Sequence, residues 1–242
     1  MKKNYDIFSE YYDEINNSFW LEYKRIFFKM IDIKILENSY ALDLGCGTGS
    51  GIEQLKYLGF KNITGIDISK PMLNIAKQKF PDVKFMNLSM EIYEANNKKD
   101  LIICNFDSIN YLTKKESWEK LFINVFKNLK NNGIFIFDTL TPYDHKKLWP
   151  INTRVIEKDN YTLINHGDFV KGLAKMHYSW FIYNKGKYDK FYEIHEQKSF
   201  SNTELKKIIK RHGLKVIESV DFNNGMKPTA KSIRVIYKCK KI

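Results

Sequence analysis

Residues 40–69 read YALDLGCGTGSGIEQLKYLGFKNITGIDIS and contain the clearest structural signal in the chain. A short apolar run leads into a loop with glycine at positions 45, 47 and 49, a helix-length segment follows, and a second apolar run ends at Asp67. Glycines in such a loop let the backbone turn tightly and approach a ligand with no Cβ in the way. A strand, glycine-rich loop, helix, strand and acid in this order predict a nucleotide-binding βαβ unit.

The same alternation continues along the chain. Short β-branched or aromatic runs predict strands, and the longer segments between them predict helices with one apolar face. We expect strands over 40–45, 62–69, 83–88, 100–106 and 132–138, and helices over 50–58, 71–80 and 115–130. Asn131-Asn132-Gly133 predicts a left-handed C-cap for the last helix. Strands that alternate with helices predict an α/β protein with a Rossmann-like, doubly wound, mostly parallel sheet.

The pattern changes after Pro150. Three aromatic-rich runs are separated by short turn sequences, which favours an antiparallel meander, and a helix and two more strands close the chain. These segments are 161–169, 173–184 and 190–200, then 202–211, 214–220 and 232–238. We therefore expect a seven-stranded domain made of residues 1–145 and 201–242, with an antiparallel β insertion, residues 146–200, after its fifth strand.

Composition sets further limits on the class of protein. The chain has 242 residues, of which 43% are hydrophobic and 28% charged, so it can bury a proper core and is not a disordered chain. No apolar run approaches the roughly 20 residues of a membrane helix. The first residues, MKKNYDIFSEYYDE, turn acidic and aromatic where a signal peptide needs an apolar stretch. We expect a cytoplasmic protein with no membrane partner. Its three cysteines are expected to be reduced and, because no ligand spacing occurs, no metal is expected.

The net charge of +12 raises the question of a nucleic-acid partner. Residues 1–150 carry 21 basic and 19 acidic side chains, whereas residues 151–242 carry 19 and 9, so the excess belongs to the C-terminal part. Only four of the 40 basic residues are arginines, the type preferred for bidentate phosphate recognition. The basic segment LKKIIKRHGLK (205–215) also carries an apolar stripe typical of a packed surface helix. We expect no nucleic-acid partner, and interpret the excess as favouring an anionic small molecule.

The loop itself indicates which nucleotide is bound. Its third glycine comes one residue earlier than in the G-x-G-x-x-G motif of NAD sites, and Asp43 precedes it. An acid beside the loop suits a cationic amine better than a pyrophosphate. The sequence therefore favours a ligand with an amino acid end and an adenosine end, whose ribose hydroxyls Asp67 can accept.

ALDLGCGTG followed by GIDISKPML resembles the class I S-adenosylmethionine-dependent methyltransferases, over roughly residues 36–140. The resemblance implies that S-adenosyl-L-methionine is the cofactor, with Asp43 reaching its amine through water, Asp67 holding the ribose, and Ile68 and Met72 flanking the adenine. Ser89 stands where the family often has an acid that contacts the adenine amino group. The complete set of expected cofactor-binding residues is Asp43, Gly45, Cys46, Gly47, Gly49, Asp67, Ile68, Met72, Ser89, Met90 and Asn105.

A narrower resemblance covers most of the chain. YDIFSEYYDEI (5–15), NFDSINYL (105–112) and KSIRVIYKCKK (231–241) are similar to segments of small-molecule methyltransferases related to glycine and amino-sugar N-methyltransferases. That resemblance implies that the insertion covers the active site as a substrate lid. It favours transfer of a methyl group to an amine nitrogen of a small molecule. A hydroxyl oxygen is the second alternative, RNA the third, and a catalytically silent cofactor-binding protein the last.

Methyl transfer from a sulfonium is an in-line displacement, so orientation and desolvation supply much of the acceleration, and a hydroxyl acceptor also needs a base. We expect Tyr12, Asn110 and His166 to act at the methyl group or the acceptor. Further candidates are Tyr5, Tyr11, Phe106, Asp107 and His195. The alternative interpretation of the tyrosines is core packing of an N-terminal helix.

Alternation in the insertion predicts one polar and one apolar face. We assign Ile164, His166, Asp168, His177, Ser179, Phe181, Glu193, His195 and Gln197 to the first, and Met176, Tyr178, Trp180 and Ile182 to the second. The polar face either lines the substrate pocket or is simply solvated. The aromatic-rich insertion is also a candidate surface for homo-oligomer formation.

Overall fold

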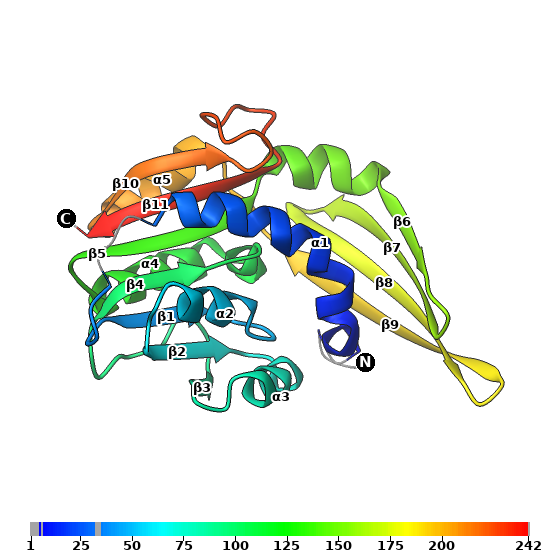
Figure 1. Ribbon diagram of the computed structural model, residues 1–242. Coiled ribbons are helices and arrows are strands. Elements are labelled where there is room, and N and C mark those ends of the chain that lie inside the picture. Colours follow the sequence, from blue (N-terminus) through cyan, green and yellow to red (C-terminus); the bar gives the residue numbers. More distant parts are fainter. Residues whose placement is uncertain (1–4, 6, 32–34, 242) are drawn as a thin grey trace.

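The computed structural model describes residues 5, 7–31 and 35–241, so the ends of the predicted domain at 1–4, 6 and 242 lie outside the described residues. Figure 1 shows two sheets joined by a long N-terminal helix. The larger sheet consists, in spatial order, of β10 (Leu214–Asp221), β11 (Arg234–Lys241), β5 (Leu129–Leu140), β4 (Lys99–Cys104), β1 (Tyr40–Leu44), β2 (Asn62–Asp67) and β3 (Lys84–Asn87). The smaller sheet consists of β6 (Thr153–Glu157), β7 (Tyr161–Val170), β8 (Leu173–Asn184) and β9 (Lys187–Gln197).

The larger sheet confirms the predicted fold class. β1 pairs in parallel with β2 on one side and with β4 on the other, β3 and β5 continue the parallel pairing outward, and β11 is antiparallel to β5. Because the chain moves outward from β1 in both directions, the sheet has a topological switch point between β1 and β4. Open α/β sheets bind ligands outside the carboxyl ends of their strands at such a point.

Helices cover both faces of this sheet (Figure 1). α4 (Lys115–Asn128) and α5 (Asn202–Arg211) bury their apolar stripes on one face, with Trp118 and Phe122 fully buried. α2 (Ser50–Tyr57), α3 (Lys70–Lys79) and the C-terminal half of α1 (Phe8–Lys29) pack on the other, where Tyr23 and Phe27 are fully buried. These two apolar layers hold the carboxyl ends of the strands in fixed positions.

The bounds of several strands differ from the predicted ones. β5 is longer at both ends than 132–138, β9 spans Lys187–Gln197 instead of 190–200, and β11 spans Arg234–Lys241 instead of 232–238. Two further differences have a local cause. β6 was not predicted, because TRVIE at 153–157 is largely exposed and lacks a clean alternation. The predicted left-handed cap at 131–133 is wrong: α4 ends at Asn128, and Leu129 is already extended and paired with Lys99. Asn132 does have a positive φ of 65°, but it lies where the pairing register between β4 and β5 shifts.

The four-stranded sheet, which we call the lid sheet (residues 153–197), is antiparallel throughout and lies between β5 and α5 in the chain. Two short helical turns, η2 (Asp144–Leu148) and η3 (Trp149–Ile151), lead into it, and the boundary predicted at residue 146 falls within η2. α1 joins the two sheets, because its N-terminal residues Phe8 and Tyr11 pack on Trp180 of the lid sheet.

The register of the lid sheet corrects the predicted faces. His166 pairs with His177, but His195 pairs with Met176, and Glu193 pairs with Tyr178. Side chains of directly paired residues point to the same face. The polar side chains of β9 therefore share the inner face, toward α1, with the aromatic side chains of β8. Glu193, His195 and Gln197 are at most 3% exposed, so solvated polar residues are the wrong interpretation for β9.

Three further observations concern composition. The three cysteines are buried and unpaired. Within the part of the chain that the structure describes, no helix combines the length and apolar character needed to cross a bilayer. The same described residues hold no cluster of three or more His, Cys, Asp or Glu side chains able to bind a metal ion.

Candidate functional site

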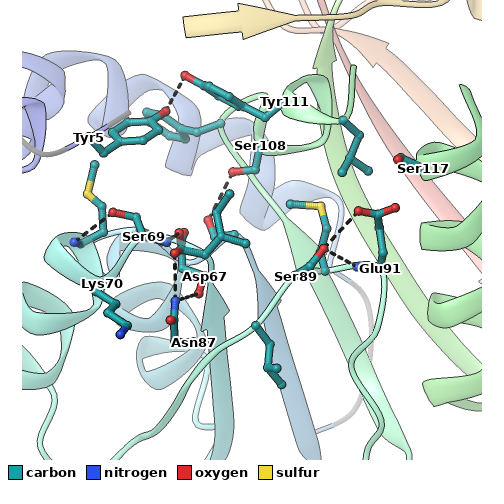
Figure 2. A pocket seen from close by; sticks show the side chains of 18 of the residues that line it. Tyr5, Asp67, Ser69, Lys70, Asn87, Ser89, Glu91, Ser108, Tyr111 and Ser117 are labelled. Carbon is teal, nitrogen blue, oxygen red and sulfur yellow. Dashed lines mark hydrogen bonds between the residues drawn. The ribbon is translucent and has the colours of Figure 1, made fainter. Parts of the chain in front are cut away.

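A cavity of about 840 Å³ opens at the carboxyl ends of β1 and β2, beside the loop that follows β4 (Figure 2). The predicted residues that line it are Tyr5, Tyr12, Gly45, Gly47, Asp67, Ile68, Met72, Ser89, Met90 and Phe106. A small adjoining pocket of about 20 Å³ is lined by Asp43, Cys46 and Asn105, and Gly45, Gly47 and Tyr12 border both spaces. Of the predicted cofactor-binding set, only Gly49 lines neither space.

The glycine loop is shaped by positive φ angles. Gly45 and Gly47 have φ of 70° and 52°, which side chains with a Cβ rarely adopt. A Cβ on Gly45 would lie 2.8 Å from the Ser108 Cβ, whereas Gly47 has no atom within 4 Å of that position and so leaves the space beside the loop open. Gly49 is the N-cap of α2 and lies against the Phe80 ring, so its part is structural.

Asp43 and Asn105 place two uncompensated polar groups beside this loop. Asp43 is 2% exposed, and burial, with a smaller contribution from the nearby Asp67, raises its pKa to about 8. Asn105 accepts a hydrogen bond from the Tyr23 hydroxyl at 3.0 Å, while its buried Nδ2 has no partner among the described residues. A buried carboxyl and an unpaired amide donor fit a ligand that carries both a cationic amine and an anionic carboxylate.

Asp67 is held at the end of β2 by the backbone. Its Oδ2 accepts from the Gly47 N–H at 2.9 Å and its Oδ1 from the Ser69 N–H at 2.8 Å. Burial raises its pKa, and these backbone hydrogen bonds oppose the rise. Each carboxylate oxygen can accept a second hydrogen bond. Asp67 therefore keeps acceptor capacity beyond its backbone hydrogen bonds, which a ribose hydroxyl can use.

An apolar slot lies beyond Asp67. Ile68 is 73% exposed although it is apolar, while Met72 is 2% exposed, and both line the cavity with Met90. Ser89 accepts from the Glu91 N–H and donates to its carboxylate, at 3.3 and 3.2 Å (Figure 2). Glu91 also lines the cavity and was missed in the sequence, although an acid two residues after Ser89 was a visible signal.

The N-terminal tyrosines have different surroundings. Tyr12 borders both spaces, and its pKa lies above its usual value because it is buried and near Asp107. Tyr5 lines the cavity and donates a hydrogen bond to Tyr111, a second residue that sequence reasoning missed (Figure 2). The ring centroids of Tyr11 and Tyr161 are 4.5 Å apart, so Tyr11 packs against the core, as the alternative interpretation of the tyrosines predicted. Phe106, with φ of 59°, packs on Trp20 and lines the cavity.

Asn110 does not line the cavity. It is fully buried, and its Nδ2 donates to the carbonyls of Leu140 and Lys198 at 3.2 and 2.8 Å. Its Oδ1 accepts from Thr139 Oγ1 and from the Leu140 N–H, both at 3.0 Å. These four bonds use its whole capacity, so the side chain is committed to joining β5 and the end of β9 and has none left for an acceptor.

His166 lies on the outer face of the lid sheet, is exposed, and stacks on His177 with 4.8 Å between ring centroids. It therefore does not reach the cavity. Asp107 does not line the cavity either: its carboxylate accepts from Arg234 and from Gln197, both at 2.6 Å. The cations that line the cavity are Lys70 and Lys114, both outside the basic C-terminal part of the chain.

Comparison with known proteins finds methyltransferases both by sequence and by structure. A family model described as a methyltransferase domain matches residues 41–133. YqeM of Bacillus subtilis (strain 168), which is named as a methyltransferase with no acceptor stated, is 32% identical over 222 residues, 88% of each chain. An S-adenosylmethionine-dependent methyltransferase from Clostridium acetobutylicum ATCC 824 superposes with a TM-score of 0.86 at 27% identity, covering 98% of both chains. The dTDP-3-amino-3,4,6-trideoxy-alpha-D-glucopyranose N,N-dimethyltransferase of Streptomyces venezuelae is 23% identical, covering 74% of this chain and 77% of that protein.

Proposed function

Because this chain belongs to the class I S-adenosylmethionine-dependent methyltransferases, we propose that it methylates an amine nitrogen of a small molecule. The bound cofactor, S-adenosyl-L-methionine, supplies an electrophilic methyl group on a sulfonium sulfur. In our proposal Asp43 and Asn105 hold its amino acid end, Asp67 its ribose, and Ile68, Met72 and Met90 its adenine. Ser89 and Glu91, which lie beside this apolar slot, then accept hydrogen bonds from the adenine amino group.

The size and extent of the cavity support the proposal that the acceptor is a small molecule. At about 840 Å³ it has the size of small-molecule sites in general, and it extends from the glycine loop to Tyr5 and Tyr111 near the lid sheet. An RNA strand requires an extended basic groove with aromatic stacking platforms. The basic residues 207 and 210 lie instead on the exposed side of α5.

Two observations support an amine as the acceptor. The cavity wall near the tyrosines presents aromatic faces and neutral hydroxyls, which suit an amino group both as hydrogen-bond acceptors and through cation–π attraction. The Streptomyces venezuelae relative is named for N-methylation of an amino sugar. Lys70 and Lys114 at the same cavity support an anionic group elsewhere on the acceptor.

The test of the cofactor site is thermal and chemical stabilisation. S-adenosyl-L-methionine at 100 times its dissociation constant should add about 2.7 kcal/mol to the free energy of unfolding. The Asp67→Asn variant should need a much higher concentration for the same effect, because an amide accepts through only one of its two terminal atoms. Absence of stabilisation of the unsubstituted protein would contradict the assignment of the cavity to the cofactor.

The test of the acceptor class is methyl uptake from labelled S-adenosyl-L-methionine. The panel consists of amino sugars and their nucleotide-linked forms, free amino acids, hydroxyl analogues of each, and transfer RNA. We expect label on an amine and none on RNA. Label on the hydroxyl analogues alone would replace the amine by an oxygen acceptor. Label on RNA alone would overturn the small-molecule proposal.

Self-association through the lid sheet stays a prediction. Tyr183 and Tyr188 are 50% and 60% exposed and pack on each other at the β8–β9 turn. A double change of both tyrosines to serine should shift the elution volume in size-exclusion chromatography if copies associate there.

A further inference from the structure

A chain of polar side chains runs from the cavity into the interface between the two sheets. The Tyr5 hydroxyl donates to the Tyr111 hydroxyl, which lies 3.1 Å from Nδ1 of His195. Nε2 of His195 lies 3.4 Å from Oε2 of Glu193. Oε1 of Glu193 in turn accepts from the Ile7 N–H at 2.7 Å.

The two ends of this chain lie in different environments. Tyr5 and Tyr111 line the cavity, and Figure 2 shows their side chains meeting at one end of it. His195 and Glu193 are 1% and 3% exposed. Burying a carboxylate and an imidazole is costly unless they are paired and hydrogen-bonded. A purely structural tie between the N-terminal segment and β9 needs only Glu193, whereas His195 and Tyr111 extend the chain as far as the cavity.

The hydrogen-bond order gives the chain a direction. Glu193 is acceptor-only when ionised, so Nε2 of His195 carries the proton and Nδ1 is free to accept from Tyr111. Tyr111 then accepts from Tyr5, and the Tyr5 oxygen keeps its remaining acceptor position for a donor in the cavity. Enzymes use this arrangement to remove protons: a base lies beside the nucleophile or acceptor, and a carboxylate orients the base.

We propose that Tyr5, Tyr111, His195 and Glu193 form a relay that takes a proton from the acceptor. The inference rests on the proposed function, since an amine that arrives as an ammonium must lose a proton before its electron pair can attack the methyl group. The acceptor N–H bond breaks and its proton goes to the Tyr5 oxygen, while the Tyr5 proton passes to Tyr111 and the Tyr111 proton to Nδ1 of His195. The imidazolium that results is paired with Glu193, and the nitrogen keeps the electron pair.

The groups around His195 are compatible with this step. The ring faces Tyr5 and Phe8 from the N-terminal segment and α1, Tyr111 from η1 (Ser108–Tyr111) and Tyr178 from β8. Burial raises the pKa of all three tyrosines, so they stay neutral, and Tyr5 and Tyr111 transmit protons as hydroxyls. Glu193 is the one carboxylate among these described neighbours, and the nearby Asp107 is already paired with Arg234.

His195→Gln and Tyr111→Phe test the relay kinetically. Glutamine keeps hydrogen bonds to both neighbours but cannot take up a proton. With the best amine of the panel at pH 7, we expect kcat to fall about 10- to 100-fold in both variants, and KM for the amine and cofactor affinity to change less than threefold. The matched control is His177→Gln, the same change on the outer face of the lid sheet, which should keep full activity.

The pH dependence separates a relay from a structural role. As the pH rises from 7 to 10, a growing fraction of the amine arrives already neutral, so the deficit of His195→Gln should shrink. A deficit that stays constant over this range, or no deficit at all, would overturn the relay. If the panel shows an oxygen acceptor instead, the amine proposal fails on its own. The relay then requires a deficit with that hydroxyl compound.

An acceptor-independent readout completes the test. In protein labelled with ¹⁵N-histidine, assigned through His195→Gln, His195 should show a protonated Nε2 and a hydrogen-bonded, unprotonated Nδ1. Tyr111→Phe should shift the Nδ1 resonance and leave those of His177 unchanged. A protonated Nδ1 in the unsubstituted protein, or no response to Tyr111→Phe, would overturn the relay whatever the acceptor is.

Discussion

Asp43 is buried against Gly51, at the start of α2, and we expect its protonation state to respond to a charged ligand. Burial raises its pKa to about 8, so in the free protein it is mostly protonated at pH 7. A cationic amine nearby favours the ionised form and therefore displaces that proton.

We predict that S-adenosyl-L-methionine binding at pH 7 releases most of one proton per molecule. Calorimetric titration in two buffers with different ionisation enthalpies measures it. The Asp43→Asn variant should release none and bind at least ten times more weakly. Proton uptake by the unsubstituted protein would contradict this account.

The same pKa shift sets a dependence of stability on pH. A carboxyl whose pKa rises on folding binds more protons in the folded state, so its contribution falls as the pH rises from about 4 to about 8. Denaturant unfolding of the cofactor-free protein measures this effect. Between pH 5 and pH 8 the free energy of unfolding should decrease more in the unsubstituted protein than in Asp43→Asn. Equal losses in the two proteins would refute the shift.

Gly51 was not among the predicted site residues, yet its position is tightly constrained. A Cβ there would lie 2.3 Å from Oδ2 of Asp43 and 3.1 Å from the Ile103 side chain. Alanine normally stabilises a helix relative to glycine, but here we predict that Gly51→Ala lowers the free energy of unfolding by about 1–3 kcal/mol through overpacking. It should also weaken cofactor binding. Tyr57→Ala, 82% exposed on the same helix, should have little effect on either measurement.

At the scale of elements, Asn110 ties β9 to the end of β5 by hydrogen bonds to Leu140 and Lys198. Each net hydrogen bond contributes about 1 kcal/mol, and the unpaired groups left behind add to the loss. We predict that Asn110→Ala destabilises the protein by roughly 2–4 kcal/mol, measured by urea unfolding. If the variant keeps full stability but has a raised KM for the acceptor, this account is wrong and Asn110 contacts the acceptor directly, as the sequence predicted.

Periodicity was informative for each strand of the lid sheet but not for their relation. Successive side chains of β8 and of β9 point to opposite faces, so the sequence separates two faces within each strand. It does not say which face of β9 meets which face of β8, because register is set by the turns and by partners distant in sequence. His166 and His195 therefore looked equivalent in the sequence. The pairing of His195 with Met176 alone directs it inward.

At the scale of the whole molecule, the basic excess lies away from the cavity. Lys207 and Lys210 are exposed on α5, and Lys175 and Lys190 lie on the outer face of the lid sheet, on the side of His177. We predict that kcat/KM for a small acceptor changes less than twofold between 50 and 200 mM salt, and that Lys207→Glu with Lys210→Glu leaves it unchanged. A loss of a hundredfold or more over that salt range would indicate a polyanionic substrate.

The residues that we propose for cofactor binding could be named from the sequence because their signal is local. The glycine loop, Asp67 and the apolar residues after it follow consecutive strands, so their order along the chain fixes their place at one edge of a parallel sheet. For the proposed acceptor side, the sequence named Tyr5 and His195 as separate candidates but did not show their connection through Tyr111. These side chains come from three segments that meet only where the N-terminal segment, η1 and the lid sheet pack together. Short-range spacing determined the Rossmann-like fold, and long-range packing alone decided which buried polar groups are connected to the cavity.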